Sequence, residues 1–283
     1  MVLEALENPE HAEKNPKNMF FYGLLYTSIA ILISYWVFPD QSSLVMIFLT
    51  VMAISPLFYK TIKYEEEKDM SDMDEKVLLK EHSRALSFFM WFFIGATLSF
   101  SIWYVFLPQS ISQTLFSTQT STILDINGNV TGKVIGVFDV FSKIFFNNLR
   151  VLIFCLIFAF LYGFGAIFVL TWNASVIGVA IGNFIRSGIA NVSNLFGAQG
   201  IMLYFKALSL GILRYSIHGI PEILAYFVGG LAGGIISVAV IKHDLRTKNF
   251  EKILLDSSDM IIISVVLLLI AALLEVFVTP LFF

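Results

Sequence analysis

The chain has 283 residues, of which 57% are hydrophobic and only 14% are charged, and its mean hydropathy is +0.81. A soluble domain is usually about 45–50% apolar and about 25% charged, so this composition excludes an ordinary soluble protein. The net charge is −3 and no basic stretch is interleaved with aromatic residues, so no nucleic-acid partner is indicated.

The apolar residues are gathered into runs of about 17–24 residues, the length that a helix needs to cross roughly 30 Å of hydrocarbon. The runs are continuously apolar instead of alternating, which excludes a transmembrane β-barrel. Backbone polar groups in lipid must be satisfied within the span, so the runs are predicted to be helices. The predicted fold class is all-α: a polytopic transmembrane bundle of six or seven spans within the lipid bilayer.

The amino-terminal part is predicted to form a helical hairpin. Its two spans lie at residues 20–38 and 44–59 and are joined by a short polar turn. With the charged segment that follows, this hairpin makes up a first region, residues 1–84. Residues 85–283 form the second region, a membrane domain.

The most charged stretch of the chain lies at residues 60–84. We interpret its three consecutive acids, Glu65, Glu66 and Glu67, as a solvated face. His82 is likewise expected at the protein surface.

The third span is predicted at residues 85–107 and is followed by a polar loop, rich in Ser, Thr and Gln, at residues 108–132. Residues 133–148 carry aromatic side chains spaced among polar ones, which is typical of an amphipathic helix at the membrane surface. The fourth span is predicted at residues 149–172.

The region between residues 173 and 221 is the least regular. Residues 174–190 and 201–217 are both apolar, but the second segment carries Lys206 and Arg214 eight positions apart, on one helix face. We expect these two side chains to snorkel to the membrane surface; an anion-binding or lipid-headgroup role is the alternative. We expect residues 174–190 to cross the membrane and the second segment to be interfacial or re-entrant.

The end of the irregular region is predicted to be a helix break. Pro221 lacks a backbone N–H and interrupts regular helix pairing. Two further spans are predicted beyond it, at residues 222–241 and 260–280. The count is then seven crossings.

The distribution of Lys and Arg predicts the orientation in the cell membrane, because cytoplasmic loops are enriched in them. Residues 60–84 carry six of them, residues 242–256 carry four, and residues 108–132 carry none. We therefore expect the first two segments and the amino terminus to be cytoplasmic. The carboxy terminus is then expected outside.

Ionisable residues inside spans are costly and mark functional sites. Arg214, His218 and Glu222 are spaced by four, and Glu275 lies toward the outer end of the last span. One interpretation is that Glu222 caps a helix and pairs with Arg214 or His218. The sharper hypothesis is a metal or ion site with His218, Glu222 and Glu275 as ligands for a divalent metal such as zinc. A closed zinc site needs four ligands, so another chain or water would complete it.

Other polar residues lie within or beside the predicted spans. Asn148, Asn173 and Asn183 are expected to cap helices or to bond across them, and a polar pore lining is the alternative. Arg186 is a further charged residue inside a predicted span.

Four glycines punctuate the span at residues 222–241. Gly229, Gly230, Gly233 and Gly234 provide small residues at four-residue spacing, which lets helix backbones approach closely. We expect them to pack tightly, either within the chain or across a homodimer.

The segment from His218 to Glu222 and the Gly/Ala-rich run after it resemble the stage II sporulation protein M family, which carries His-Gly-x-x-Glu before a Gly/Ala-rich membrane helix. The family's Asn-rich helix start and its Gly-rich segment after an Asn resemble the surroundings of Asn148 and Asn173. The resemblance covers roughly residues 85–283.

The resemblance implies a polytopic scaffold or partner protein, because bacterial family members act in a membrane complex with a cell-wall hydrolase. We therefore expect a non-enzymatic, dimeric protein that organises a membrane complex or remodelling event with other membrane proteins. One alternative is a transporter or channel with an ion site at the break near His218. The last is an intramembrane metal-dependent hydrolase using His218, Glu222 and Glu275.

Overall fold

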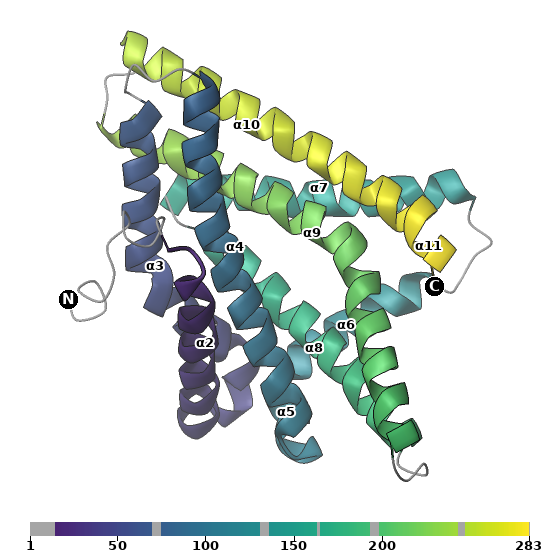
Figure 1. The fold of residues 1–283 in the computed structure, drawn as a ribbon. Coiled ribbons are helices and arrows are strands. Elements are labelled where there is room, and N and C mark those ends of the chain that lie inside the picture. The colour runs from purple at the N-terminus through teal and green to yellow at the C-terminus, as the bar shows by residue number, and fades with distance from the viewer. Residues whose placement is uncertain are drawn as a thin grey trace.

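In the computed structural model, the chain is a bundle of helices (Figure 1). The structure describes residues 15–69, 75–130, 136–162, 165–192, 198–242 and 247–282, without the side chains of residues 69, 75–77, 79, 125–130, 162, 189–192, 198–216 and 282. Within these ranges, seven helices are long and apolar enough to cross a membrane. This finding confirms the all-α, polytopic fold. The division into two regions at residue 84 stays a prediction.

The first half of the bundle is built from long helices joined by short turns. Its elements are α2 (Asn18–Val37), η2 (Pro39–Gln41), α3 (Ser42–Asp69), α4 (Glu75–Phe106), α5 (Gln109–Leu115) and α6 (Ser117–Val130). Both α3 and α4 continue well past the apolar spans expected from the sequence. The charged stretch is therefore largely helical.

The second half contains the longest helix that the structure describes. Its elements are α7 (Val137–Tyr162), α8 (Ala166–Val192), α9 (Ala198–Lys242), α10 (Lys248–Leu273), the π-helix η3 (Leu274–Val278) and α11 (Thr279–Phe282). Thr247 caps the start of α10, where its hydroxyl accepts a hydrogen bond from the Phe250 N–H. Such capping satisfies one of the N–H groups that a helix start leaves unpaired.

The prediction of a polar loop at residues 108–132 was wrong, because α5 and α6 occupy most of it. The polar side chains there bond to neighbouring helices. Gln119 is fully buried, and its Nε2 donates to the Ser43 carbonyl oxygen at 3.1 Å and to Ser175 Oγ at 3.2 Å. Ser43 and Thr118 also share a hydrogen bond of 2.7 Å. These contacts tie α6 to α3 and α8.

The prediction of an interfacial helix at 133–148, followed by a span at 149–172, was also wrong. One helix, α7, covers both segments up to Tyr162, and the chain turns before Ala166. The turn is invisible in the hydropathy because apolar residues continue through it. Gly165 permits it, since a Cβ there would overlap the Phe158 carbonyl oxygen. Asn148 and Asn173 therefore lie inside helices and not at their ends.

The predicted break at Pro221 is a bend within one continuous helix. Helix α9 has 45 residues with Pro221 inside it, and it bends sharply near its middle (Figure 1). An internal proline removes one hydrogen bond and clashes with the carbonyl four residues earlier, which kinks a helix. Residues 201–217, expected to be interfacial or re-entrant, form its first part, and the side chains of Lys206 and Arg214 lie outside the described residues.

The carboxy-terminal half of α9 is the centre of the bundle. In its most apolar stretch 78% of the positions are buried, against 22% in α7 and in the helix that begins at Lys248. Its glycines contact the chain's own helices: a Cβ on Gly229 would overlap Leu152 Cδ1, and one on Gly230 would lie 2.8 Å from the Ala166 Cβ. A Cβ on Gly233 would lie 3.0 Å from the Leu156 carbonyl oxygen. This glycine face therefore packs within the chain.

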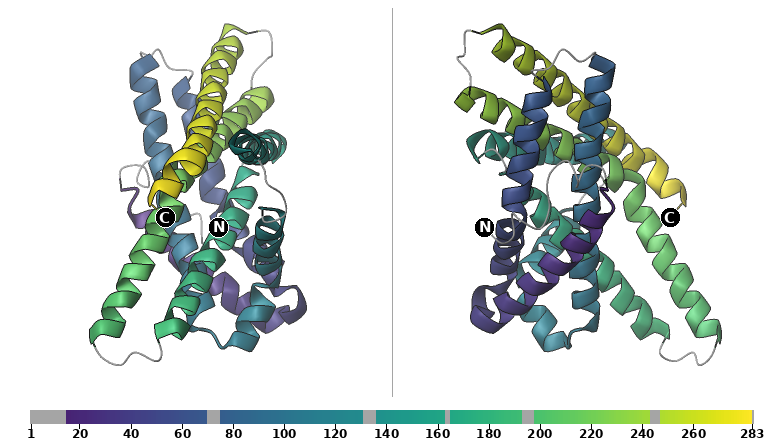
Figure 2. Two further views of the ribbon diagram at one scale, coloured as in Figure 1. Left: turned by 90° about the vertical axis from the view of Figure 1, so that its right-hand side faces the viewer. Right: turned by 60° about the vertical axis from the view of Figure 1, so that its left-hand side comes forward.

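Four helix ends meet at one end of the molecule, which we call the charged end. The end of α3, the start of α4, the end of α9 and the start of α10 lie there (Figures 1 and 2). Lys242 pairs across it with Glu66, with 2.7 Å between Nζ and Oε2. The two Lys/Arg-rich segments of the sequence thus lie side by side. This is what we expect if both lie on the same side of the membrane. Which side that is stays a prediction.

Helices α2 and α4 pack through two glycines that face each other's backbone. A Cβ on Gly95 would overlap the Phe20 carbonyl oxygen, and one on Gly23 would overlap the Phe92 carbonyl oxygen. The two helices therefore touch at backbone distance, and any side chain at these positions must push them apart.

We expect Gly95→Ala to lower the free energy of unfolding by about 1–3 kcal/mol, the usual cost of overpacking. Thermal unfolding of the purified protein in mild detergent measures it. Gly188→Ala is the matched control, because nothing lies within 4 Å of a Cβ there and alanine is the better helix former. Equal stability of the two variants would contradict the close α2–α4 contact.

Candidate functional site

A group of polar side chains is gathered where α9 bends, beside α7 and the carboxy-terminal end of the chain. Glu222 of α9 accepts a 2.8 Å hydrogen bond at Oε1 from the Tyr226 hydroxyl. The Asn148 side chain of α7 makes a second hydrogen bond to the same carboxyl. Asn148 and Tyr226 are only 7% and 1% exposed. The carboxyl therefore joins two helices through groups that are themselves buried.

The sequence positions these groups by helix geometry. Glu222 and Tyr226 are four residues apart in α9, so their side chains lie on the same face one turn apart. Asn148 lies in the middle of α7, one turn before Leu152, which contacts the Gly229 position of α9. The close approach at Gly229 thus brings the amide within reach of the carboxyl. Buried polar groups are nearly always paired in this way.

The end of the chain supplies the remaining members of the group. Glu275 lies in η3 and interacts electrostatically with Glu222. Thr279 Oγ1 lies 3.4 Å from His218 Nδ1 and donates to the Leu274 carbonyl oxygen at 3.1 Å. Short π-helical segments within α-helices are rare and occur frequently at functional sites. We call the whole group the polar junction: Asn148, His218, Glu222, Tyr226, Glu275 and Thr279.

The structure brings the three predicted ligands, His218, Glu222 and Glu275, to this one junction. It does not gather them closely: in the described part of the chain, no three His, Cys, Asp or Glu side chains are placed to hold a metal ion. His218 contacts Thr279, whereas Glu222 contacts Tyr226 and Asn148. The described contacts provide no set of ligands for a divalent metal. Binding of such a metal stays a hypothesis.

Arg186 has a defined structural partner. Its guanidinium donates to the carbonyl oxygens of Leu107 and, at 3.4 Å, Val105, and it lies 4.9 Å from the centre of the Tyr104 ring. These carbonyls lie at the end of α4, where the last turn leaves acceptors unpaired. Arg186 therefore caps α4 from α8.

The predicted asparagines of α8 lie apart from the polar junction. Asn183 is exposed. Asn173 is half-buried, and within the described residues its Nδ2 has no hydrogen-bond partner. No contact between Asn173 or Asn183 and the junction is described. Of the three predicted asparagines, Asn148 alone is described as part of the polar junction.

Sequence reasoning missed a cluster of buried charges at the charged end. The interpretation of the three acids as a solvated face was wrong for two of them, because Glu65 and Glu66 are fully buried. His82, expected at the surface, is 3% exposed, and its Nδ1 lies 2.6 Å from Glu65 Oε2. Lys68 pairs with the other oxygen of Glu65. The only sequence signal was the three-residue spacing of Glu65 and Lys68 on a helix.

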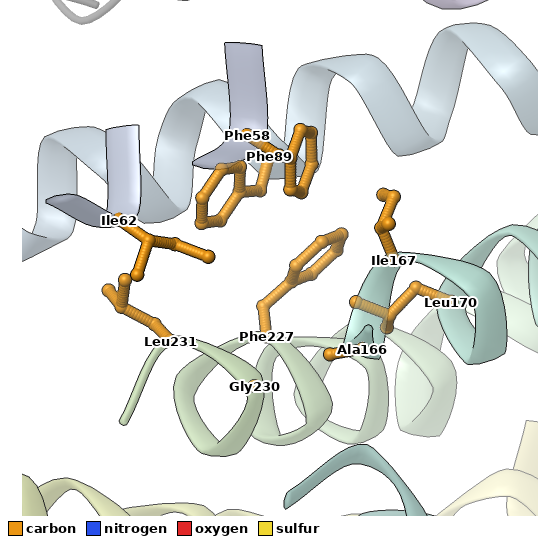
Figure 3. A pocket seen from close by; sticks show the side chains of 9 residues that line it. All are labelled: Phe58, Ile62, Phe89, Ala166, Ile167, Leu170, Phe227, Gly230 and Leu231. Atoms are coloured by element: carbon orange, nitrogen blue, oxygen red, sulfur yellow. The ribbon is translucent and has the colours of Figure 1, made fainter. Parts of the chain in front are cut away.

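One small cavity lies between α3, α4, α8 and α9 and has a volume of about 10 Å³. Its wall is entirely apolar, with the rings of Phe58, Phe89 and Phe227 on its sides (Figure 3). Phe58 and Phe89 are stacked with 4.2 Å between ring centres. Such an apolar void has no group to hold a polar ligand, so it is a packing defect of the core and not part of the polar junction.

These features define a class of protein: a multi-pass helical membrane protein whose embedded polar groups bond one helix to another. The model of the Stage II sporulation protein M family matches residues 28–280. The chain therefore belongs to this family. The match begins within α2, so it includes most of the amino-terminal hairpin that the motif resemblance left out. Searches of the curated proteins and of the solved structures give no significant match.

We expect Tyr226→Phe to destabilise the protein by about 1–3 kcal/mol, because it leaves a buried carboxyl without one of its donors. Adding Glu222→Gln should cost less in this variant than in the wild type, since the two groups share one hydrogen bond. Thermal unfolding of the four proteins of this cycle measures the coupling. Tyr35→Phe is the control at a part-exposed tyrosine. Strict additivity of the two changes would contradict the hydrogen bond between Tyr226 and Glu222.

Proposed function

We propose that the chain is a non-enzymatic membrane protein that acts as a scaffold or partner in a membrane complex or in membrane remodelling. The proposal rests on one observation: the ionisable side chains inside the helical bundle bond one helix to another. Glu222 is held between α7 and α9 by Asn148 and Tyr226, and Arg186 caps α4 from α8. These side chains fix helices to one another, which is what a rigid platform for partners needs.

Membership of the family supports the same proposal, because the resemblance implied action within a membrane complex. Exposed apolar side chains line long stretches of α2, α7 and α10. Lipid covers such faces in a membrane, and partner helices bind to them through close packing. We propose that the chain forms a homodimer and contacts other membrane proteins through these faces, with the charged end cytoplasmic.

We expect the full chain to be dimeric in mild detergent. Light scattering coupled to size exclusion measures the mass of the protein component, and two differently tagged copies expressed together should be retrieved as a pair. A strictly monomeric protein that binds no membrane partner would contradict the proposal. Gly229→Ala should leave the dimer intact, because that glycine packs inside the chain.

The second candidate function is a transporter or channel, and the polar junction favours it. Two carboxyls, Glu222 and Glu275, interact beside a bent α9 and a π-helical segment. Transporters build ion sites from discontinuous helices near the membrane midplane. Helix α9 is bent but continuous, so the transporter function is less well supported than the scaffold function. The described contacts add no support for the hydrolase hypothesis.

Flux in liposomes separates the two functions. We expect vesicles that contain the protein to pass divalent metal ions and small anions no faster than protein-free vesicles. Flux above that level that is lost in Glu222→Ala, but kept in the matched variant Glu67→Ala at an exposed position, would establish the transporter and overturn the scaffold.

A further inference from the structure

The charged end holds a compact set of ionised side chains at the contact between α3 and α4. Glu65 is fully buried, and both of its oxygens are occupied, one by Lys68 of the same helix and one by His82 of α4. Lys68 is 6% exposed and lies 3.8 Å from Glu81, again across the helix pair. Buried charges are tolerated only where partners compensate for lost hydration. Glu65 therefore depends on both cations.

The same stretch of α3 anchors the end of α9. Lys242, at the last turn of α9, pairs with Glu66 at 2.7 Å and with Glu67 at 3.2 Å. Glu65 and Glu66 are neighbours in the chain, so a shift of this turn of α3 moves both contacts. The α3–α4 contact and the anchor of α9 are thus mechanically linked.

The charge balance of this end depends on His82. In the part of the chain that the structure describes, the ion pairs there join four carboxylates to three permanent cations, Lys68, Arg84 and Lys242. A protonated His82 supplies the fourth positive charge. Histidine is the one side chain whose ordinary titration falls between about pH 5 and 8.

The charged side chains on the helix ends that meet here come from four helices. They are Glu65, Glu66, Glu67 and Lys68 of α3, Glu81 and Arg84 of α4, Lys242 of α9, and Lys248, Glu251, Lys252 and Asp256 of α10, which packs against α3 and α9. His82 is the side chain of this set whose type ordinarily titrates near neutrality. A change of pH near neutrality therefore acts on this set through His82.

We infer that His82 is a pH sensor that locks the α3–α4 hairpin and the end of α9 when it is protonated. Protonated His82 completes the partners of Glu65 and holds α3 against α4. Loss of the proton leaves a buried carboxylate with one cation fewer, so the last turns of α3 loosen and the Glu66–Lys242 anchor loosens with them. The stabilisation is present at low pH and is lost as the pH rises through the titration of His82.

The test is thermal unfolding of the full chain in nanodiscs from about pH 5.5 to about pH 8.5, a range that spans histidine titration. We expect the unfolding midpoint to fall by about 2–4 °C over this range, the shift that loss of a single interaction produces in a chain of this length. His82→Gln should remove the fall, since glutamine donates a hydrogen bond without titrating. Arg84→Gln, which removes a more exposed cation of the same end, should keep it.

Hydrogen exchange locates the change and keeps the inference testable if His82→Gln does not fold. After correction for the intrinsic effect of pH on exchange, residues 60–69 and 80–90 should exchange faster at high pH in the wild type, and the α2–α4 contact near Gly95 should not. Glu65→Gln, which removes the partner and keeps the histidine, should abolish the same response. A wild type without a pH response in these segments overturns the inference. So does a response that survives in both His82→Gln and Glu65→Gln.

Discussion

The fold depends on how closely other helices can approach the carboxy-terminal half of α9. In lipid there is little hydrophobic gain from bringing two apolar helices together, so packing and interhelical hydrogen bonds must hold them. The glycines of α9 allow both. Gly229 and Gly233 bring α7 close, Gly230 brings the start of α8 close, and the same approach places Asn148 within reach of Glu222. The polar junction is therefore a consequence of the glycine face.

Two places along α9, its bend and its last turn, make different contacts. At its bend, the helix carries the carboxyl that binds α7 and the histidine that contacts Thr279 near the end of the chain. At its last turn, Lys242 binds the acids of α3. One helix thus connects the polar junction to the charged end. Both sets of contacts lie on the same helix, which fits the proposed scaffold role and the proposed response to pH.

The sequence predicted the number and class of the spans because bilayer thickness fixes the length of an apolar run. It could not predict helix ends. Helices α3 and α4 run on past the apolar stretch, and the turn before Ala166 contains no polar signal. The break predicted at Pro221 is a kink in a continuous helix, because a proline inside a helix can bend it without ending it.

The candidate site was predictable only in part. The cost of placing His218, Glu222 and Glu275 in lipid singled them out, and all three lie at the polar junction. The partners of these residues were not predictable, since Tyr226 and Asn148 are ordinary residues made important by tertiary contacts. The burial of Glu65 and Glu66 was not predictable for the same reason. Their partners His82 and Lys242 are distant from them in the sequence, and only the fold brings these side chains together.

The central claim is that the glycine face of α9 packs against helices of its own chain, and a rescue experiment tests it most directly. Gly229→Ala should destabilise the protein, because the added Cβ overlaps Leu152 Cδ1. Leu152→Ala removes the obstructing atoms, so the account predicts that Gly229→Ala costs little or nothing in a Leu152→Ala background when unfolding is followed in detergent. An equal cost in both backgrounds, or no cost in either, would contradict the account.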